Sequence, residues 1–205
     1  MPNARTLLAT TTAIAALALT ACGATHTEGH AGPERTATVT TTPTAKPSTP
    51  SAHPLGYAAT TDGDPDTGGV LQITPTSVIY ATKTSTDKPD NGRFVIITTK
   101  VQAMTAAPAA ETAPADGGGW TYIAPDGQAI TTMDGNATTV TLDDFNGAGT
   151  FDPGTFKWDS EAFDIAPNQA GGTLSYKDGS GHITRWTLPK TNTGPQVDKV
   201  IKDLQ

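Results

Sequence analysis

Three aspartates that alternate along one short stretch, Asp62, Asp64 and Asp66, are the first residues whose types and spacing could do chemistry. Carboxylates at alternate positions of a loop are typical of calcium ligands. The EF-hand form also needs glycine at its sixth position and glutamate at its twelfth, where this chain has Thr67 and Ile73. We therefore expect no cofactor and no dedicated metal site. Calcium held between loops is one alternative, and a solvated acidic turn is the other.

Asp159 and Glu161 form a second acidic pair. Residues two apart in an extended strand share a face, which would place these carboxylates about 7 Å from each other. Paired carboxylates are the machinery of glycoside hydrolysis. Because the sequence gives no sign of an aromatic-lined cleft around the pair, a secreted hydrolase is kept only as the third interpretation.

The histidines offer no catalytic base held in register. His26, His30 and His53 lie in a Thr/Pro-rich segment with little to bury, and His182 lies two residues from Ser180 in a turn. Neighbouring residues of one turn cannot form a nucleophile–base pair that a third group orients. We therefore expect no catalytic residues and a protein that is not an enzyme.

Trp120 and Tyr122 are the candidate ligand-binding aromatics. Large aromatic side chains in short strands usually fill the core of a β-fold, and this is the first interpretation for both residues. The functional alternative is a surface platform on which a glycan or a protein would pack.

The N-terminus resembles a bacterial lipoprotein signal. Arg5 precedes an apolar run over 7–19, and the run ends in Leu19-Thr20-Ala21-Cys22. This order resembles a lipobox, in which the cysteine thiol receives a diacylglycerol group and the chain is cut before the cysteine. Two acyl chains suffice for stable anchoring. We expect lipidation of Cys22 and a position on the outer face of a bacterial cytoplasmic membrane, with an ordinary cleaved signal peptide as the alternative.

The net charge of −7 and the single cysteine exclude several classes of protein. An acidic chain repels phosphate, so nucleic acid is not an expected partner. One cysteine cannot form an internal disulfide. Abundant Thr, Gly and Pro disfavour a helical bundle. We expect a monomer.

Composition divides the chain into four segments. Residues 1–21 are expected to be the signal peptide, 22–56 the lipidated cysteine with a disordered Thr/Pro-rich linker, 57–190 one folded domain and 191–205 a tail. Apolar residues recur at helical spacing in the tail, at Val197, Val200, Ile201 and Leu204. This spacing predicts a short helix that packs on the domain; a frayed tail and a partner-binding helix are the alternatives.

Short β-branched and aromatic runs, separated by turn signals, fill the folded domain. A proline at residue 75 suggests an edge or a bulge, and the Ala/Pro-rich segment 103–119 is interpreted as a surface loop. The expected strands are 70–73, 77–82, 93–101, 120–124, 128–133, 138–142, 172–177 and 182–188, with 156–158 and 162–165 as one bent strand or two. About seven to nine short strands predict an all-β sandwich or barrel.

Three stretches resemble a family of immunoglobulin-like domains of unknown function from Gram-positive surface lipoproteins, similar to the mycobacterial immunoprotective extracellular antigen. They are the glycine-led strand 91–101, the proline-glycine turn and following strand over 152–167, and the closing hairpin 174–188. The resemblance implies an immunoglobulin-like antiparallel β-sandwich with a binding or scaffolding role outside the cell.

The expected function is therefore a membrane-anchored extracellular lipoprotein that presents a non-enzymatic binding domain. Its partner would be an unidentified extracellular protein or envelope component, contacted through the loops 103–119 and 143–155, because loops on a rigid scaffold usually carry recognition. The alternative is a structural or accessory envelope lipoprotein in which the sandwich acts as a spacer or complex subunit.

Overall fold

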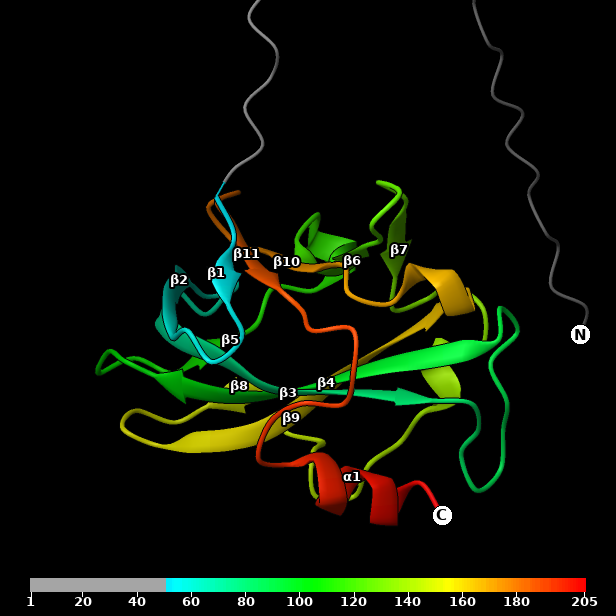
Figure 1. The fold of residues 1–205 in the computed structure, drawn as a ribbon. Helices are drawn as coiled ribbons and strands as arrows, with labels where there is room; N and C mark the ends of the chain where they lie inside the picture. The colour runs from blue at the N-terminus through cyan, green and yellow to red at the C-terminus, as the bar shows by residue number, and fades with distance from the viewer. Residues whose placement is uncertain (1–50) are drawn as a thin grey trace, which may run out of the picture. The chain divides into compact units, whose positions relative to one another are not determined.

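Two packed β-sheets make up the part of the chain that the computed structural model describes, residues 51–205 (Figure 1). The first sheet has the strand order β1-β11-β10-β6-β7, the second has the order β2-β3-β4-β9, and the short strands β5 and β8 pair with each other. Neighbouring strands are antiparallel except β1 and β11, which are parallel. The predicted all-β sandwich is confirmed.

Eleven strands and four short helical segments lie within residues 51–205. The strand count exceeds the expected seven to nine because β1, β5 and β8 are two-residue pairings that carry no sequence pattern of their own. The strands are β1 His53–Pro54, β2 Ala59–Asp62, β3 Val70–Ala81, β4 Arg93–Ala103, β5 Ala109–Ala110, β6 Gly119–Ile123, β7 Ala129–Thr131, β8 Thr150–Phe151, β9 Phe156–Ile165, β10 Thr173–Lys177 and β11 Ile183–Thr187. The helical segments are the 3₁₀ turns η1 Pro114–Asp116, η2 Ala137–Thr139 and η3 Pro167–Gln169, and the α-helix α1 Val197–Asp203.

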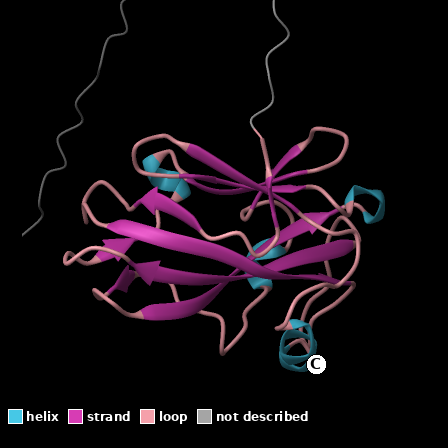
Figure 2. Cartoon of the chain, turned by 60° about the vertical axis from the view of Figure 1, so that its left-hand side comes forward, coloured by secondary structure: helices cyan, strands magenta, loops and turns pink. Residues whose placement is uncertain are grey.

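The main core lies between the two sheets, which Figure 2 shows as one layer above the other. Ile73 of β3 and Val95 of β4 belong to one buried cluster with Tyr122 of β6, Tyr176 of β10 and Trp186 of β11. Alternate residues of each strand point into this cluster, as the pleat of a strand requires. Burial of such side chains is the main force that holds the two sheets together.

The second sheet is also covered on its other face, where α1 lies beneath it in Figure 1. Phe94 and Ile96 of β4 pack there with Val200 and Leu204 of the C-terminal segment and with Phe145. Because both faces of β4 are covered, the run from Phe94 to Thr99 is buried without a break. The helix has seven residues, and no helix of residues 51–205 is long and apolar enough to cross a membrane.

Two runs that were expected to be separate strands, 70–73 and 77–82, form the single strand β3. The register against β4 shifts between Pro75 and Ser77, which marks a bulge. A bulge accommodates a residue that has no N–H to donate to the ladder. β9 is likewise one continuous strand. The hairpins β6–β7 and β10–β11 form where the turn signals predicted them.

The prediction of a strand over 138–142 is wrong. Residues 137–139 form η2, and the Thr139 hydroxyl donates to the carbonyl oxygen of Asn136 at 2.8 Å. Such local side-chain bonds compete with strand pairing. Leu142 and Phe145 then pack with Phe94, Ile96 and Val200 on the outer face of the second sheet, in a group that we call the outer cluster. Tertiary contacts therefore override the β-propensity of this segment.

The folded part begins before residue 57, inside the stretch expected to be linker. His53 of β1 pairs with Trp186 of β11, and Leu55 packs against the main core. The indole N–H of Trp186 donates to the carbonyl oxygen of Tyr57 at 2.9 Å. The predicted signal peptide, Cys22, His26 and His30 lie outside the described residues.

Candidate functional site

Three carboxylates from two separate parts of the fold gather at one side of the sandwich. Glu111 follows β5, whereas Asp159 and Glu161 lie two residues apart on β9. One oxygen of each residue lies within 4.8 Å of an oxygen of both others. We call these three residues the acidic cluster.

The position of the cluster on β9 is unusual for a sandwich strand. Phe163 and Ile165, further along the same strand, belong to the core between the sheets. Alternation places Asp159 and Glu161 on the same face of β9 as these two apolar residues. The strand therefore has carboxylates at positions that would normally continue the apolar core.

A cavity of about 350 Å³ opens over the acidic cluster. It is lined by Ala110 of β5, by residues 111–114 that follow β5, by Gly119 and Trp120 of β6, and by residues from the loop that leads through β8. The two segments that were expected to make contacts, 103–119 and 143–155, thus border the same cavity. The first is less of a free loop than expected, because it contains β5, which pairs with β8, and η1.

Burial raises the pKa values of all three members of the acidic cluster, and repulsion from the other carboxylates adds to the rise at Glu111 and Glu161. Burial raises the pKa of Glu111 to about 8, the nearby charge of Asp159 adds to this, and the hydrogen bond from the Trp120 indole N–H to Oε2, at 3.1 Å, opposes it. Burial also holds the pKa of Glu161 well above its ordinary value, with the charges of Glu111 and Asp159 as further causes. The pKa of Asp159 is raised by burial, against a hydrogen bond from the Ser160 N–H at 2.8 Å. Such a cluster gains free energy by taking up protons or a cation.

Sequence reasoning placed two members of this site and missed the third. It put Asp159 and Glu161 on one face of a strand, where the structure has them. Glu111 was missed because it stands in an Ala/Pro-rich segment whose path depends on the β5–β8 pairing. Glu111 is the only glutamate of the segment 103–119, and this is the sole sign in the sequence that the residue could belong to a site.

Trp120 and Tyr122 belong to the buried core, not to a surface platform. Trp120 is 5% exposed, and it touches the candidate site because it lines the cavity and donates to Glu111. Tyr122 is fully buried; its hydroxyl donates to the carbonyl oxygen of Gln169 and accepts from the Gly172 N–H. Of the two aromatics considered for binding, only Trp120 therefore borders the cavity.

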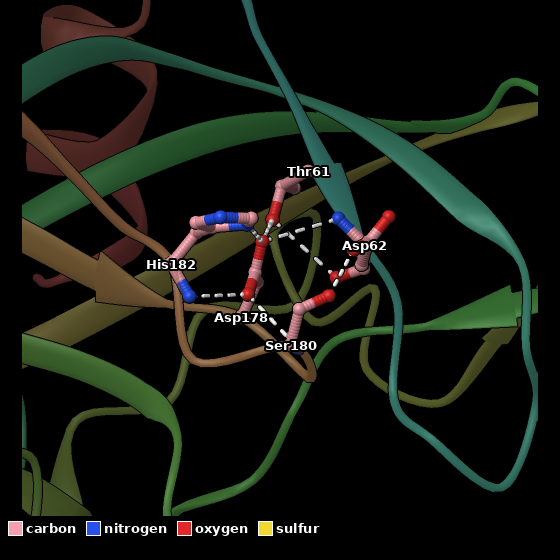
Figure 3. Close-up of polar contacts among 5 residues, drawn as sticks. All are labelled: Thr61, Asp62, Asp178, Ser180 and His182. Carbon is pink, nitrogen blue, oxygen red and sulfur yellow. Dashed lines mark hydrogen bonds and ion pairs between the residues drawn. The ribbon is translucent and has the colours of Figure 1, made fainter.

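The three aspartates considered as calcium ligands are not brought together. Asp64 accepts from the N–H of Asp66 at 2.9 Å, within its own turn. Asp62 instead faces the β10–β11 turn, where its carboxylate comes near Asp178 and His182 (Figure 3). The alternative of a calcium site formed by Asp62, Asp64 and Asp66 is therefore not supported, and Asp62 joins a different group of side chains.

Hydrogen bonds inside the molecule satisfy most of this second group, as the dashed lines in Figure 3 show. One oxygen of the buried Asp178 carboxylate accepts from the Thr61 hydroxyl at 3.1 Å and from the Asp62 N–H at 3.3 Å. The other accepts from the N–H groups of Ser180 and His182. The Ser180 hydroxyl donates to Asp62, and the His182 side chain is 84% exposed. This arrangement ties β2 to the β10–β11 turn and forms no serine–histidine pair.

A larger cavity of about 530 Å³ lies beside β1. Its lining consists of threonine, proline, leucine and glycine residues, and no titratable side chain contributes to it. It therefore offers shape but no charge or catalytic group, and the acidic cavity is the stronger candidate.

Comparisons with known proteins give two structural likenesses. No protein-family model matches the chain, and no curated protein matches it. A secreted protein of Mycobacterium tuberculosis, MPT63, is 17% identical with a TM-score of 0.46, over 68% of this chain and 98% of that one. A putative lipoprotein of Bacillus subtilis, YcdA, is 13% identical with a TM-score of 0.41, over 71% of this chain and 41% of that one. Membership of the immunoglobulin-like family stays a prediction.

Proposed function

We propose that this chain is a lipid-anchored protein outside the cytoplasmic membrane, that it is not an enzyme, and that it binds its ligand in the acidic cavity. The observation that carries the proposal is the convergence of the segments 103–119 and 143–155 with Trp120 and three carboxylates around one cavity. Carboxylates bind cationic or hydrogen-bond-donating groups. The proposed ligand is therefore an envelope component that presents such a group.

The proposed anchor is the lipidated Cys22, for which the support is the sequence order of charge, apolar run and small residues before the cysteine. The proposed linker is the Thr/Pro-rich stretch between Cys22 and the folded domain.

Energetics favour binding over the spacer alternative. Buried carboxylates reduce the stability of a fold unless they are paired. A spacer needs only a stable sandwich, and apolar side chains at residues 159 and 161 would serve it better. Perturbed, costly groups that border a cavity are candidates for a functional site.

The convergence of three carboxylates also favours binding over glycoside hydrolysis. Glycoside hydrolysis uses a pair of carboxyl groups that flank the scissile bond in separate roles. In the acidic cluster, one oxygen from each of three residues lies within 4.8 Å of the other two, so all three can contact one bound group.

The test is a pull-down from solubilised native envelope with residues 23–205 as bait. Wild-type bait should retain one dominant component. Glu161→Gln, which keeps the shape of the side chain and removes its carboxylate, should lose that component, and the control Asp198→Asn, which is exposed on α1 and does not line the cavity, should keep it. Equal recovery by Glu161→Gln would reject the cavity as the site, and no recovery by any bait would favour the spacer function.

A further inference from the structure

The spacing of the acidic cluster matches the coordination sphere of a single metal ion. Calcium binds oxygen ligands at about 2.3–2.6 Å, so ligands on opposite sides of one ion lie about 5 Å apart. One oxygen from each of Glu111, Asp159 and Glu161 falls within 4.8 Å of the other two. One ion could therefore contact all three carboxylates without a rearrangement of the backbone.

Polar atoms at this site lack partners within the protein. Oε1 of Glu111 is buried and accepts no hydrogen bond. Thr112, which is 2% exposed and lines the same cavity, has a hydroxyl group with no partner either. Buried polar atoms are nearly always satisfied, so an orphan oxygen beside two further carboxylates points to a missing ligand.

Within residues 51–205, no basic side chain forms an ion pair with the acidic cluster. In residues 51–205 the ion pairs are Lys199 with Asp144 and His182 with Asp178, and neither includes a member of the cluster. The nearest lysine of β9, Lys157, donates instead to the carbonyl oxygen of Thr150 at 3.2 Å. No ion pair within the described residues therefore competes with an ion from outside for these carboxylates.

We propose that the acidic cavity binds a divalent cation of the calcium type, with Glu111, Asp159 and Glu161 as its protein ligands. This inference rests on the proposed function, since it names a ligand of the same site. Carboxylate and hydroxyl oxygens favour hard cations such as calcium over zinc, which prefers nitrogen and sulfur. The cavity of about 350 Å³ also has room for the waters that complete a coordination shell of six to eight oxygens.

Trp120 provides the readout for the test, because its indole nitrogen lies 3.1 Å from Oε2 of Glu111. Terbium(III), a luminescent substitute for calcium, would be titrated into residues 23–205 with excitation of tryptophan. We expect saturable terbium emission that excess calcium displaces. Glu161→Gln should weaken terbium binding about tenfold or more, because it removes one charged ligand. Asp62→Asn, in the second group of side chains, should leave it unchanged.

Two results would overturn the inference. One is the lack of saturable emission, together with the lack of any heat of calcium binding in calorimetry. The other is emission that survives Glu161→Gln and is lost in Asp62→Asn, which would place the ion beside Asp178 and His182. Repeating the envelope pull-down in a chelator separates this inference from the proposed function. If the chain retains its partner but binds no ion, only the cation site is rejected. If the chain binds the ion but retains no partner, only the recognition function is rejected.

Discussion

Glu111 links the chemistry of the cavity to the stability of the fold. Its pKa is about 8 in the folded chain, against an ordinary value of 4.5. Between these two pH values the folded chain keeps a proton that the unfolded chain has lost. Raising the pH through this window therefore weakens folding, since the unfolded state binds fewer protons.

We predict that the free energy of unfolding, measured by urea denaturation in a chelator, falls from about pH 5 to about pH 8 and then levels off. Asp159 and Glu161 act in the same direction, because burial raises their pKa values too. Glu111→Gln should reduce the fall, since glutamine does not titrate. An identical pH dependence in the variant would show that Glu111 has an ordinary pKa.

Asp164 is a buried carboxylate with a structural role. It is 1% exposed and accepts from the backbone N–H groups of Asp90, Asn91 and Asn136 at 2.6, 2.9 and 2.9 Å. Asp164→Ala leaves three donors without an acceptor, and we predict a loss of about 3 kcal/mol in the free energy of unfolding. The exposed control Asp143→Ala should change it by less than about 0.5 kcal/mol. Similar losses for the two variants in urea denaturation would contradict this role.

At the scale of elements, α1 and the segment around Phe145 turn a plain sandwich into a sheet buried on both faces. Val200 is fully buried in the outer cluster, whereas Ile201, next to it on the helix, is 36% exposed. The helix has only seven residues, so its stability comes from docking, not from intrinsic propensity.

We predict that Val200→Ala lowers the free energy of unfolding by about 2 kcal/mol, through lost burial and a cavity against the outer face of the second sheet. Ile201→Ala removes a larger side chain from a more exposed site, and should cost about 0.5 kcal/mol. Chemical denaturation of the two variants makes the comparison. A greater loss for Ile201→Ala would mean that the helix does not dock through Val200.

Local signals explain which elements the sequence could predict. The β-branched run of β4 and the Pro-Asp-Gly turn between β6 and β7 act within a few residues, and both elements form where they were expected. The pairing of β5 with β8 and of β1 with β11 joins segments far apart in the chain, and two-residue strands leave no period to detect. The segment 138–142 had β-branched residues but is held by packing on the outer face of the second sheet.

At the scale of the whole molecule, the candidate site also combines residues that local patterns predict with one that only long-range contacts bring in. Asp159 and Glu161 could be placed together because strand geometry fixes residues two apart. Glu111 joins them because the segment between β4 and β6 passes close to β9, and no local pattern specifies that path. The structure therefore adds to the sequence the third carboxylate and the cavity above it.

The proposed attachment to the membrane depends on one atom, the sulfur of Cys22. We predict that Cys22→Ser moves the protein from the membrane fraction to the soluble fraction, because two acyl chains supply the anchoring free energy. Thr27→Ser, in the linker, should stay with the membrane. Fractionation and immunoblotting make the measurement, and a Cys22→Ser protein that still pellets with membranes would contradict lipid anchoring.

The most direct test of the acidic cavity as the recognition site is photocrosslinking in the native envelope. A photoreactive residue would replace Ala113, which is exposed at the cavity, or Lys83, which is exposed and does not line it. We predict a discrete adduct from residue 113 that disappears when Glu161→Gln is added, and none from residue 83. An adduct of equal strength from residue 83, or one from residue 113 that ignores Glu161→Gln, would contradict it.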